Sequence, residues 1–423
     1  MMAEPRIYAT YWIETAFPLQ QAAETMAGEQ STGTFVRVPG ETDELREAHA
    51  ARVEEIVELG EVTAPSLPGS GLPRSGDATR RAARVTLSWP ISNMGLSLPN
   101  VLAAINGNLS ELKAFSGLRL IDVRFPPEFL TRYQGPQFGI EGTRRLAGVF
   151  DRPIIGTIIK PSVGLSPEAT AEQVRGLIEA GIDFIKDDEL QGDGPHCPFN
   201  ARISAVMRVI NDHADRTGKK VMYAANLTGD IDEMLARHDH VVAEGGTCIM
   251  ASMNSIGLPA MKVLRAHSQL PIHGHRNGWG MLGRSPAIGM SYIAFQKLWR
   301  LAGIDHTHVN GIDNKFCESD DSVIASAREC LTPMFPAPHK DCRIMPVFSS
   351  GQSARQAAPT FAALGSIDCI FAAGGGIMAH PAGPAAGVRA LRQAWDAAVA
   401  GIPAAEAAGK SPELKAALEA FSG

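Results

Sequence analysis

One lysine and three carboxylates occupy four consecutive positions of the sequence, from Lys186 to Glu189. They follow a short apolar run that begins at Gly181 and is typical of a buried strand. Clustered carboxylates repel one another and lose hydration on burial, so a strand that ends in them needs compensating charge. A divalent cation would supply that charge, and ligands that are all oxygen suit Mg²⁺. The same four residues taken alone are typical of a solvated loop, so the rest of the chain must decide.

The composition bounds the classes of protein to which the chain can belong. Its 423 residues favour two domains, and 45% hydrophobic with 20% charged residues is ordinary globular composition. A net charge of -6 without a basic stripe argues against nucleic-acid binding, and no apolar run is long enough to span a membrane. The start lacks a signal pattern and the six cysteines form no C-x-x-C pair, so we expect reduced thiols in a cytoplasmic protein.

The first 135 residues mix strands and helices, which predicts an α+β domain of the ferredoxin-like kind. Strands are predicted at Arg6–Glu14, Thr34–Val38, Ala82–Trp89 and Leu118–Phe125. Helices are predicted at Pro18–Gly28, Thr42–Gly60 and Leu98–Ile105, the second of them long and amphipathic.

Residues 136–423 change to short apolar runs that alternate with helices, the pattern of a parallel sheet. Eight such strands over roughly 250 residues predict an α/β fold, a (β/α)8 TIM barrel. The expected strands are Ile154–Lys160, Ile182–Asp187, Lys220–Asn226, Thr247–Ser252, Pro271–His275, His306–Asn310, Arg343–Ser349 and Cys369–Ala373. Ser166, Pro167 and Gly181 have the types expected around the helix between the first two strands.

Polar residues gather at the carboxyl ends of these strands, the face where barrel enzymes carry their active sites. They are Lys160, Lys186, Asp188, Glu189, Asn226, His273, His275, Arg276, His306, His308, Ser349 and Gly374–Gly376. From the alternation of side chains along a strand, we expect His273 and His306 to face away from the pocket and to orient their neighbours. Asp187 is expected to point away from a metal for the same reason.

Five motifs carry a resemblance to a known family: Gly156–Pro161, Gly181–Glu189, His273–Arg276, Gly303–His308 and Gly374–Gly376. Over nearly the whole chain, the sequence resembles the large subunit of ribulose-bisphosphate carboxylase. It is more similar to the RuBisCO-like (form IV) proteins, which share the fold of that subunit without its reaction.

The resemblance implies a metal site and a set of catalytic groups. Lys186 matches the lysine that CO2 carbamylates, and with Asp188 and Glu189 it would hold Mg²⁺. Lys160 matches a lysine that assists proton transfer, and His275 matches a histidine near the reacting carbons. Lys315 matches a loop lysine that reaches the substrate carboxylate.

The resemblance also implies how the substrate is bound. Arg276, His308 and Ser349 match groups around one phosphate end, and Gly351, Gly374 and Gly375 match backbone donors around the other. Glu29, Thr34 and Asn108 match residues that complete the site of a partner subunit. The implied assembly is therefore a homodimer or a multiple of dimers, with no small subunit.

Departures from the carboxylase argue against fixation of CO2 on ribulose bisphosphate. Ser162 replaces a second lysine, Trp279 replaces a histidine, Phe35 replaces a tryptophan clamp, and Ser350 replaces a glycine. The loop around Lys315 also lacks the usual Gly-Lys-Leu-Glu pattern. The groups that remain imply an enediolate held on Mg²⁺.

The resemblance leaves three functions open. The first is decarboxylation of a sugar-acid phosphate, 3-oxo-isoapionate 4-phosphate, or its transcarboxylation or hydrolytic carbon–carbon cleavage. The second is a methionine-salvage reaction, that of the 2,3-diketo-5-methylthiopentyl-1-phosphate enolase or a related isomerase, although Asn108 stands where those enolases use a lysine base. The third is a non-catalytic stress or regulatory role, which would give the chain no reason to retain Lys186, Asp188 and Glu189.

Overall fold

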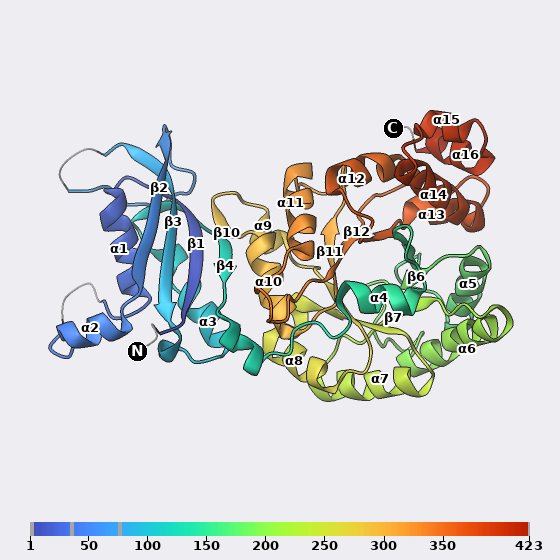
Figure 1. The fold of residues 1–423 in the computed structure, drawn as a ribbon, viewed down its shortest axis with the longest axis horizontal. Helices are drawn as coiled ribbons and strands as arrows, with labels where there is room; N and C mark the ends of the chain where they lie inside the picture. The colour runs from blue at the N-terminus through green and yellow to red at the C-terminus, as the bar shows by residue number, and fades with distance from the viewer. Residues whose placement is uncertain (1–3, 34–37, 75–77, 422–423) are drawn as a thin grey trace. The chain divides into compact units, whose positions relative to one another are not determined.

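The computed structural model describes residues 4–33, 38–74 and 78–421 (Figure 1). The chain divides into two compact units. The first comprises the residues up to Tyr133 together with Gly278–Leu298 and Met334–Asp341, and the second comprises the remainder. The domain boundary expected after residue 135 stays a prediction.

A five-stranded mixed sheet forms the first unit, in the order β10-β4-β1-β3-β2. Its strands are β1 (Arg6–Thr15), β2 (Arg52–Val62), β3 (Arg80–Pro90), β4 (Phe115–Arg124) and β10 (Ile288–Met290). Central strand β1 pairs antiparallel with both β3 and β4, and its residues Ile7, Ala9, Tyr11 and Ile13 are fully buried. Helices α1 (Leu19–Glu29), α2 (Asp43–His49) and α3 (Leu98–Ile105) accompany the sheet, and α1 contacts β2 and β3.

The predicted helix at Thr42–Gly60 is wrong. Helix α2 ends at His49, and β2 then pairs with β3 along its whole length. Because β2 is an edge strand with mostly exposed side chains, its sequence lacks the alternation that marks a half-buried strand, and its glutamates favour a helix. The other strands and helices predicted for this unit are confirmed, apart from Thr34–Val38, most of which lies outside the described residues.

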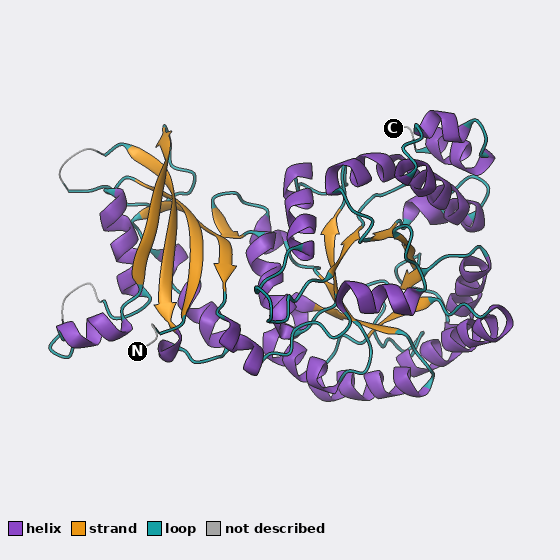
Figure 2. Cartoon of the chain, in the orientation of Figure 1, coloured by secondary structure: helices purple, strands orange, loops and turns teal. Residues whose placement is uncertain are grey.

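A closed eight-stranded parallel barrel forms the core of the second unit, which confirms the predicted fold class (Figure 2). All eight predicted strands are present, each within two residues of its expected ends. They are β5 (Ile154–Ile158), β6 (Phe184–Lys186), β7 (Met222–Asn226), β8 (Cys248–Ser252), β9 (Ile272–His275), β11 (His306–Asn310), β12 (Met345–Phe348) and β13 (Ile370–Ala372).

Helices follow the barrel strands and cover the barrel from outside (Figure 2). Those that lie within the second unit are α4 (Gly139–Ala147), α5 (Pro167–Glu179), α6 (Phe199–Thr217), α7 (Ile231–Ala243), α8 (Met253–His267), α11 (Asp320–Leu331), α12 (Ala357–Leu364), α13 (Gly375–Met378), α14 (Pro384–Val399), α15 (Ala404–Ala408) and α16 (Pro412–Ala420). The short α9 (Gly280–Gly283) belongs to the first unit, and α10 (Tyr292–Ala302) spans the division between the units.

Local sequence signals fix the strand that carries the chemistry. As predicted, the Ser166 hydroxyl caps α5 by accepting a hydrogen bond from Ala169 N at 3.2 Å, and Gly181 takes φ +86° just before β6. In the neighbouring strand, a Cβ on Gly156 would lie 2.9 Å from a ring carbon of Phe184. Glycine at this position therefore lets β5 and β6 pair closely inside the barrel.

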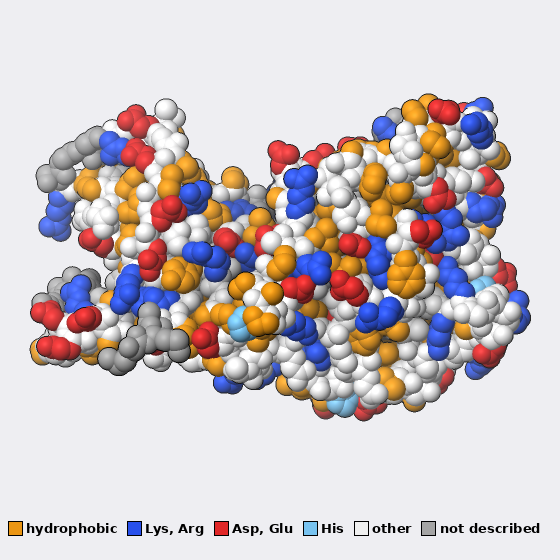
Figure 3. All heavy atoms as spheres, in the orientation of Figure 1, with side chains coloured by type: hydrophobic (Ala, Val, Ile, Leu, Met, Phe, Trp, Pro, Cys, Tyr) orange, Lys and Arg blue, Asp and Glu red, His pale blue; other side chains and the backbone are white. Residues whose placement is uncertain are grey.

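On the face shown in Figure 3, basic and acidic side chains are interspersed. Among the described residues, no helix combines the length and the apolar composition needed to cross a bilayer.

Candidate active site

Lys186 is the last residue of β6, and its side chain is completely buried. Its Nζ donates to the carbonyl oxygen of Asp187 at 2.8 Å and to Glu189 Oε2 at 3.2 Å. Burial lowers the pKa of Lys186 and outweighs the opposing effect of the neighbouring carboxylates. The neutral amine is therefore more accessible here than in an ordinary lysine.

Lys160 and Asp188 form an ion pair beside Lys186. Lys160 Nζ donates to Asp188 Oδ2 at 2.6 Å and to Ser162 Oγ at 3.0 Å. The register of the barrel explains this contact, because Ile158 pairs with Lys186 and the residues two positions further along each strand then meet. Asp188 is 1% exposed, whereas the Lys160 side chain is 41% exposed. Gln173 of α5 hydrogen-bonds both the backbone N–H and the carbonyl of Lys160, which fixes the base of this lysine.

Glu189 faces His275 at the end of β9, with 3.4 Å between Glu189 Oε2 and His275 Nε2. Asn277 N donates to His275 Nδ1, so the hydrogen of the neutral ring is on Nε2 and is directed at the carboxylate. Burial, with Lys186 nearby, lowers the pKa of His275 to about 4, so the ring is neutral at pH 7. Burial opposes ionisation of Glu189, but Lys186 and His275 outweigh it and lower the pKa of that carboxyl.

Asp187 points away from this cluster, as predicted. Its carboxylate accepts hydrogen bonds from Tyr223 OH at 2.5 Å and from Asn226 N at 2.9 Å, and it pairs with the fully buried Arg202. Asn226 in turn donates to the carbonyl oxygens of Glu189 and Gln191. Asp187 and Asn226 therefore act as structural supports for the segment that carries Asp188 and Glu189.

Four histidines of β9 and β11 lie together inside the barrel. The ring of His273 is 5.7 Å from that of His306 and 4.8 Å from that of His308, which is 4.6 Å from that of His275. The prediction that His273 and His306 face away is therefore wrong, because residues two apart on a strand point to the same side. Burial lowers the pKa of His306 to about 3 and that of His273 and His308 well below the usual value, so these rings are neutral.

Hydrogen bonds assign the tautomers of two of these histidines, His273 and His308. His273 Nε2 lies 2.8 Å from His308 Nε2, and His308 Nδ1 lies 2.8 Å from Ser349 Oγ. His273 Nδ1 has no partner among the described residues, and a buried N–H without an acceptor is costlier than a bare ring nitrogen. His273 therefore donates to His308, and His308 donates to Ser349. The Ser349 hydroxyl hydrogen is then left for another acceptor.

Arg276 follows directly after β9 and is bound by an internal carboxylate. Its Nη2 donates to Glu318 Oε2, and the two side chains are 9% and 14% exposed. No local sequence pattern predicts the contact between Arg276 and Glu318, because the two residues are 42 positions apart in the sequence. Only the closed barrel brings these two residues together.

Lys315 lies in the exposed loop after β11, and its Nζ rests 5.2 Å from the centre of the Phe316 ring. Its backbone N–H donates to the carbonyl oxygen of Ser350, and a Cβ on Gly351 would lie 3.6 Å from that nitrogen. Gly374 lies beside Lys160, since a Cβ on it would be 3.9 Å from Lys160 Cε. Gly374 is the N-cap residue of the short helix α13, which begins at Gly375. The structure thus associates Lys315 with Gly351, and Lys160 with Gly374.

The remaining predicted residues belong to the first unit. Glu29 ends α1 and Asn108 precedes a short 3-10 turn, and both are exposed. With its amide oriented to satisfy both ends, Gln30 accepts from Asn108 N at 2.9 Å, so these two segments lie together. Thr34 lies outside the described residues.

Comparison with known proteins identifies the family of this chain. The profile for "Ribulose bisphosphate carboxylase large chain, catalytic domain" matches residues 139–421, and that for the N-terminal domain of the same chain matches residues 3–129. This protein belongs to the RuBisCO large-chain family.

Several relatives of this RuBisCO-family chain are named for reactions at carbon–carbon bonds. It is 58% identical over 413 residues to the 3-oxo-isoapionate-4-phosphate transcarboxylase/hydrolase of Xanthobacter autotrophicus, covering 98% of each chain. It is 46% identical over 418 residues to the 3-oxo-isoapionate-4-phosphate decarboxylase of Rhizobium etli, covering 98% of this chain and 99% of the relative. The crystal structure of a rubisco-like protein from Burkholderia fungorum matches with a TM-score of 0.91 and 46% identity, covering 98% of this chain and 100% of that one.

The residues at the end of β6 fit the magnesium site that the family implies. Asp188 and Glu189 each bind a lysine ammonium, so positive charge is favoured at both carboxylates. Lys186 offers a buried amine, and burial lowers its pKa. The lower pKa favours the neutral amine, which is the form that reacts with CO2 to give a carbamate. The donor set would then be entirely oxygen and anionic, as Mg²⁺ prefers.

A second group of potential ligands, His238, Asp239 and His267, does not fit a metal. Gln269 N donates to His238 Nε2, so the hydrogen of that ring is on Nδ1, the atom 3.0 Å from Asp239 Oδ1. A metal would need a lone pair on Nδ1. The hydrogen bonds of this cluster therefore mark a structural contact.

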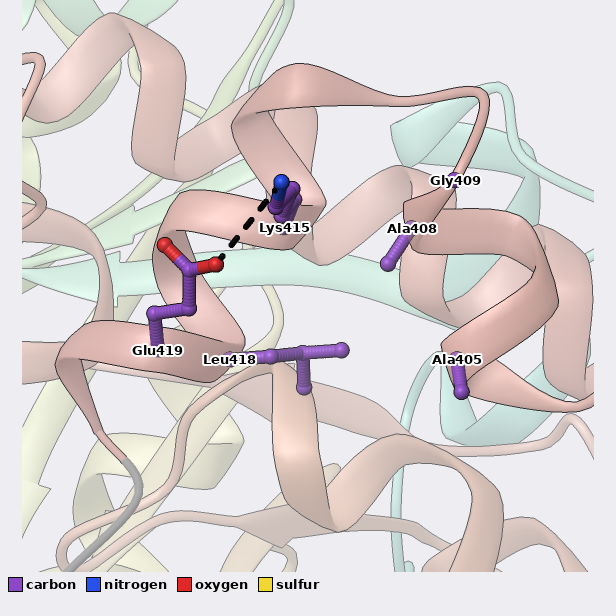
Figure 4. A pocket seen from close by; sticks show the side chains of 6 residues that line it. All are labelled: Ala405, Ala408, Gly409, Lys415, Leu418 and Glu419. Carbon is purple, nitrogen blue, oxygen red and sulfur yellow. Dashed lines mark ion pairs between the residues drawn. The ribbon is translucent and has the colours of Figure 1, made fainter.

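The hollow between α15 and α16 also lacks features of a site. Figure 4 shows its lining, in which the only charged groups are Lys415 and Glu419, an exposed ion pair of 4.0 Å. Ala405, Ala408 and Leu418 supply a small apolar wall. No convergent polar groups face it.

Trp279, which stands where the carboxylase has a histidine, packs within the first unit. Its ring is 5.1 Å from Tyr292 and 4.8 Å from Phe295, and its side chain is buried. The departure at this position therefore replaces a polar group with part of an aromatic cluster.

Proposed function

We propose that this RuBisCO-family protein is an enzyme that cleaves a carbon–carbon bond of 3-oxo-isoapionate 4-phosphate, with decarboxylation as the principal reaction. The observation that supports this most is the buried amine of Lys186 against Glu189, beside the Lys160–Asp188 ion pair. Three relatives of this chain, at 58%, 46% and 44% identity, are named for reactions of that compound.

The chemistry of the substrate sets what the site must do. In a 3-oxo acid, the bond to the carboxyl carbon breaks with its electron pair moving toward the keto group. CO2 departs, and negative charge collects on oxygen as an enediolate. A site that accelerates this step must stabilise that oxygen and then protonate the carbon.

Lys186, Asp188 and Glu189 would hold Mg²⁺. Lys186 joins this set after its neutral amine attacks CO2 and releases one proton, which gives an anionic carbamate. When bound, Mg²⁺ supplies the positive charge that stabilises the enolic oxygens. His275 directs its Nε2–H into the same region and can hydrogen-bond a substrate oxygen.

Lys160 would deliver the proton. It holds a hydrogen between Nζ and Asp188 Oδ2, and its partial exposure lets the proton be replaced from water. Lys315, carried by the loop beside Gly351, would contact the substrate carboxylate. Backbone N–H groups at Gly351, Gly374 and Gly375 and the side chains of Arg276, His308 and Ser349 would fix the two ends of the molecule.

A hydrolytic or transcarboxylating variant would use the same groups, since water can add to the polarised keto carbon before the adjacent bond breaks. The relative from Xanthobacter autotrophicus carries that name, which keeps the variant as a second candidate. A methionine-salvage enolase is disfavoured, because the amide of Asn108 cannot act as a base.

The test is NMR of the product mixture from carboxyl-labelled ¹³C substrate in D2O. Decarboxylation predicts labelled CO2 or bicarbonate and a deuteron on the adjacent carbon. Hydrolytic cleavage predicts two acids and no labelled CO2, and absence of any product would contradict the proposal. Labelled bicarbonate with ribulose bisphosphate should give no fixation.

We also propose a cytoplasmic homodimer, or a multiple of dimers, without a small subunit. In it, Glu29, Thr34 and Asn108 would complete the site of the partner subunit. Analytical ultracentrifugation that finds only monomers would contradict this assembly.

A further inference from the structure

Glu318 is a charged residue of the barrel rim that the proposed chemistry leaves unused. This residue lies just before α11, and its carboxylate accepts a hydrogen bond from Arg276 Nη2. Both side chains are largely withdrawn from water, at 14% and 9% exposed. The negative charge of Glu318 therefore neutralises the guanidinium that follows His275.

Glu318 is held in this position independently of Arg276. Asn310 Nδ2 donates to Glu318 Oε2 at 2.7 Å, and Ser322 Oγ donates to Oε1 at 2.9 Å. Asn310 adopts φ 66° at the end of β11, and its Oδ1 accepts from Ser350 Oγ at 2.9 Å. A carboxylate with three donors on two oxygens is a fixed part of the rim, because moving it away would break every one of these bonds.

We propose that Glu318 is a specificity-determining residue that restricts this site to substrates with a single phosphate. The inference rests on the proposed function, in which the substrate is a sugar-acid monophosphate. An arginine alone at this rim would bind a phosphate well, because its planar N–H groups match phosphate oxygens. With Glu318 in place, a second phosphate would lie beside a carboxylate in a region with little water to screen the repulsion.

The pair still allows recognition of an uncharged end. A guanidinium has five N–H donors, so an arginine engaged by one carboxylate can also hydrogen-bond a hydroxyl group. Arg276 with Glu318 is thus suited to the hydroxyl end of a monophosphate.

The test compares ribulose 5-phosphate with ribulose 1,5-bisphosphate, which share a carbon chain and differ by one phosphate. Isothermal titration calorimetry on the full chain measures both dissociation constants for wild type, for Glu318→Gln and for the control Ser322→Ala. Glu318→Gln keeps the shape and removes the charge, whereas Ser322→Ala removes one hydrogen bond and keeps the charge.

Wild type and Ser322→Ala should bind the bisphosphate no more tightly than the monophosphate. Glu318→Gln should improve binding of the bisphosphate at least tenfold, with little change for the monophosphate. The proposal is overturned if Glu318→Gln binds the bisphosphate no better than wild type does. It is also overturned if wild type already prefers the bisphosphate tenfold, a result that needs no variant. Because binding is measured without turnover, these outcomes are separate from failure of the proposed decarboxylation.

Discussion

The two ends of β6 both carry buried charge, but they treat it in opposite ways. Before the strand, Asp183 is completely buried and accepts hydrogen bonds from Arg152 at 2.5 and 3.1 Å, Lys219 at 2.6 Å and Ile155 N at 3.0 Å. Both carboxylate oxygens are saturated by fixed donors. This end ties β6 to the start of β5 and to the segment before β7.

The carboxyl end of the same strand is left open. Lys160 and Glu189 are 41% and 31% exposed, and two of the carboxylates there, Asp188 and Glu189, are each paired with a lysine. Buried charge alone therefore does not mark an active site. What distinguishes the carboxyl end is that Asp188 and Glu189 are paired with lysines, and that Lys160 and Glu189 are partly exposed to solvent.

Of the expected effects on activity, that of Lys186→Met should be the largest. This substitution would remove the proposed carbamate ligand, so kcat should fall on the order of 10³-fold, the effect of losing charge stabilisation at a developing oxyanion. The free energy of unfolding should change by less than about 1 kcal/mol, because an apolar chain replaces a buried amine and Glu189 keeps access to water. Turnover and urea unfolding measure the two effects. Retained activity would remove Lys186 from the chemistry.

Withdrawal of Mg²⁺ and bicarbonate should have the next largest effect. Enzyme treated with EDTA in CO2-free buffer should lose about 10²-fold of its activity or more, since the enolic charge is then unsupported. Preincubation with both Mg²⁺ and bicarbonate should restore it. Full activity in EDTA without CO2 would contradict the magnesium proposal.

Asp183→Asn and Asp188→Asn are matched variants that test the difference between the two ends of β6. Asp183→Asn leaves Arg152 and Lys219 without their anion, so it should lower the free energy of unfolding by about 3 kcal/mol. The kcat of the folded enzyme should stay within about twofold. Asp188→Asn should do the reverse, with little loss of stability and a large loss of kcat. If the two variants lose stability and kcat to the same extent, the proposed difference between the two ends of β6 is contradicted.

The pH dependence of stability tests the ion pairs that Asp183 forms. Burial opposes ionisation of Asp183, but Arg152 and Lys219 outweigh it and lower the pKa of the carboxyl. Its contribution is therefore fully present above the unfolded-state pKa of about 3.9 and is lost as pH falls toward the lower folded value. The stability gap between wild type and Asp183→Asn should thus be constant near neutrality and should narrow below about pH 4.

His273→Leu should give the smallest effect. It removes the donor that fixes the His308 tautomer, so Ser349 is no longer held as a donor. KM should rise about fivefold, roughly the value of one hydrogen bond, with kcat changed by less than about threefold. Nitrogen NMR of His308 should show a mixture of tautomers. A single unchanged tautomer would show that His273 only fills space.

Much of this fold could be predicted because its signals are local. Each barrel strand is a short apolar run between helical segments, so all eight could be placed from the sequence. Strand β2 could not, because its identity depends on pairing with β3 rather than on its own pattern. Strand β10 has three residues and joins β4 from more than 160 positions away, so no local signal identifies it.

The residues of the candidate site also fall into those with a local sequence signal and those without one. Lys186, Asp188 and Glu189 are adjacent in the sequence and could be found by inspection. The Lys160–Asp188 pair required the register of β5 against β6, and the Glu318–Arg276 pair required closure of the barrel. Contacts between distant segments are set by tertiary structure, so a resemblance that covers each segment separately did not reveal them.

The seam between β13 and β5 has a consequence for how the chain matures. Ile370 pairs with Ile154, and Thr157 Oγ1 donates to the carbonyl oxygen of Ala373, 216 residues away. A nascent polypeptide emerging from the ribosome can therefore complete the ring only after β13, at Ile370–Ala372, has been synthesised. Until then β5, the neighbour that aligns Lys160 with Asp188, has an open edge, and premature termination anywhere upstream would yield a product unable to assemble a working centre.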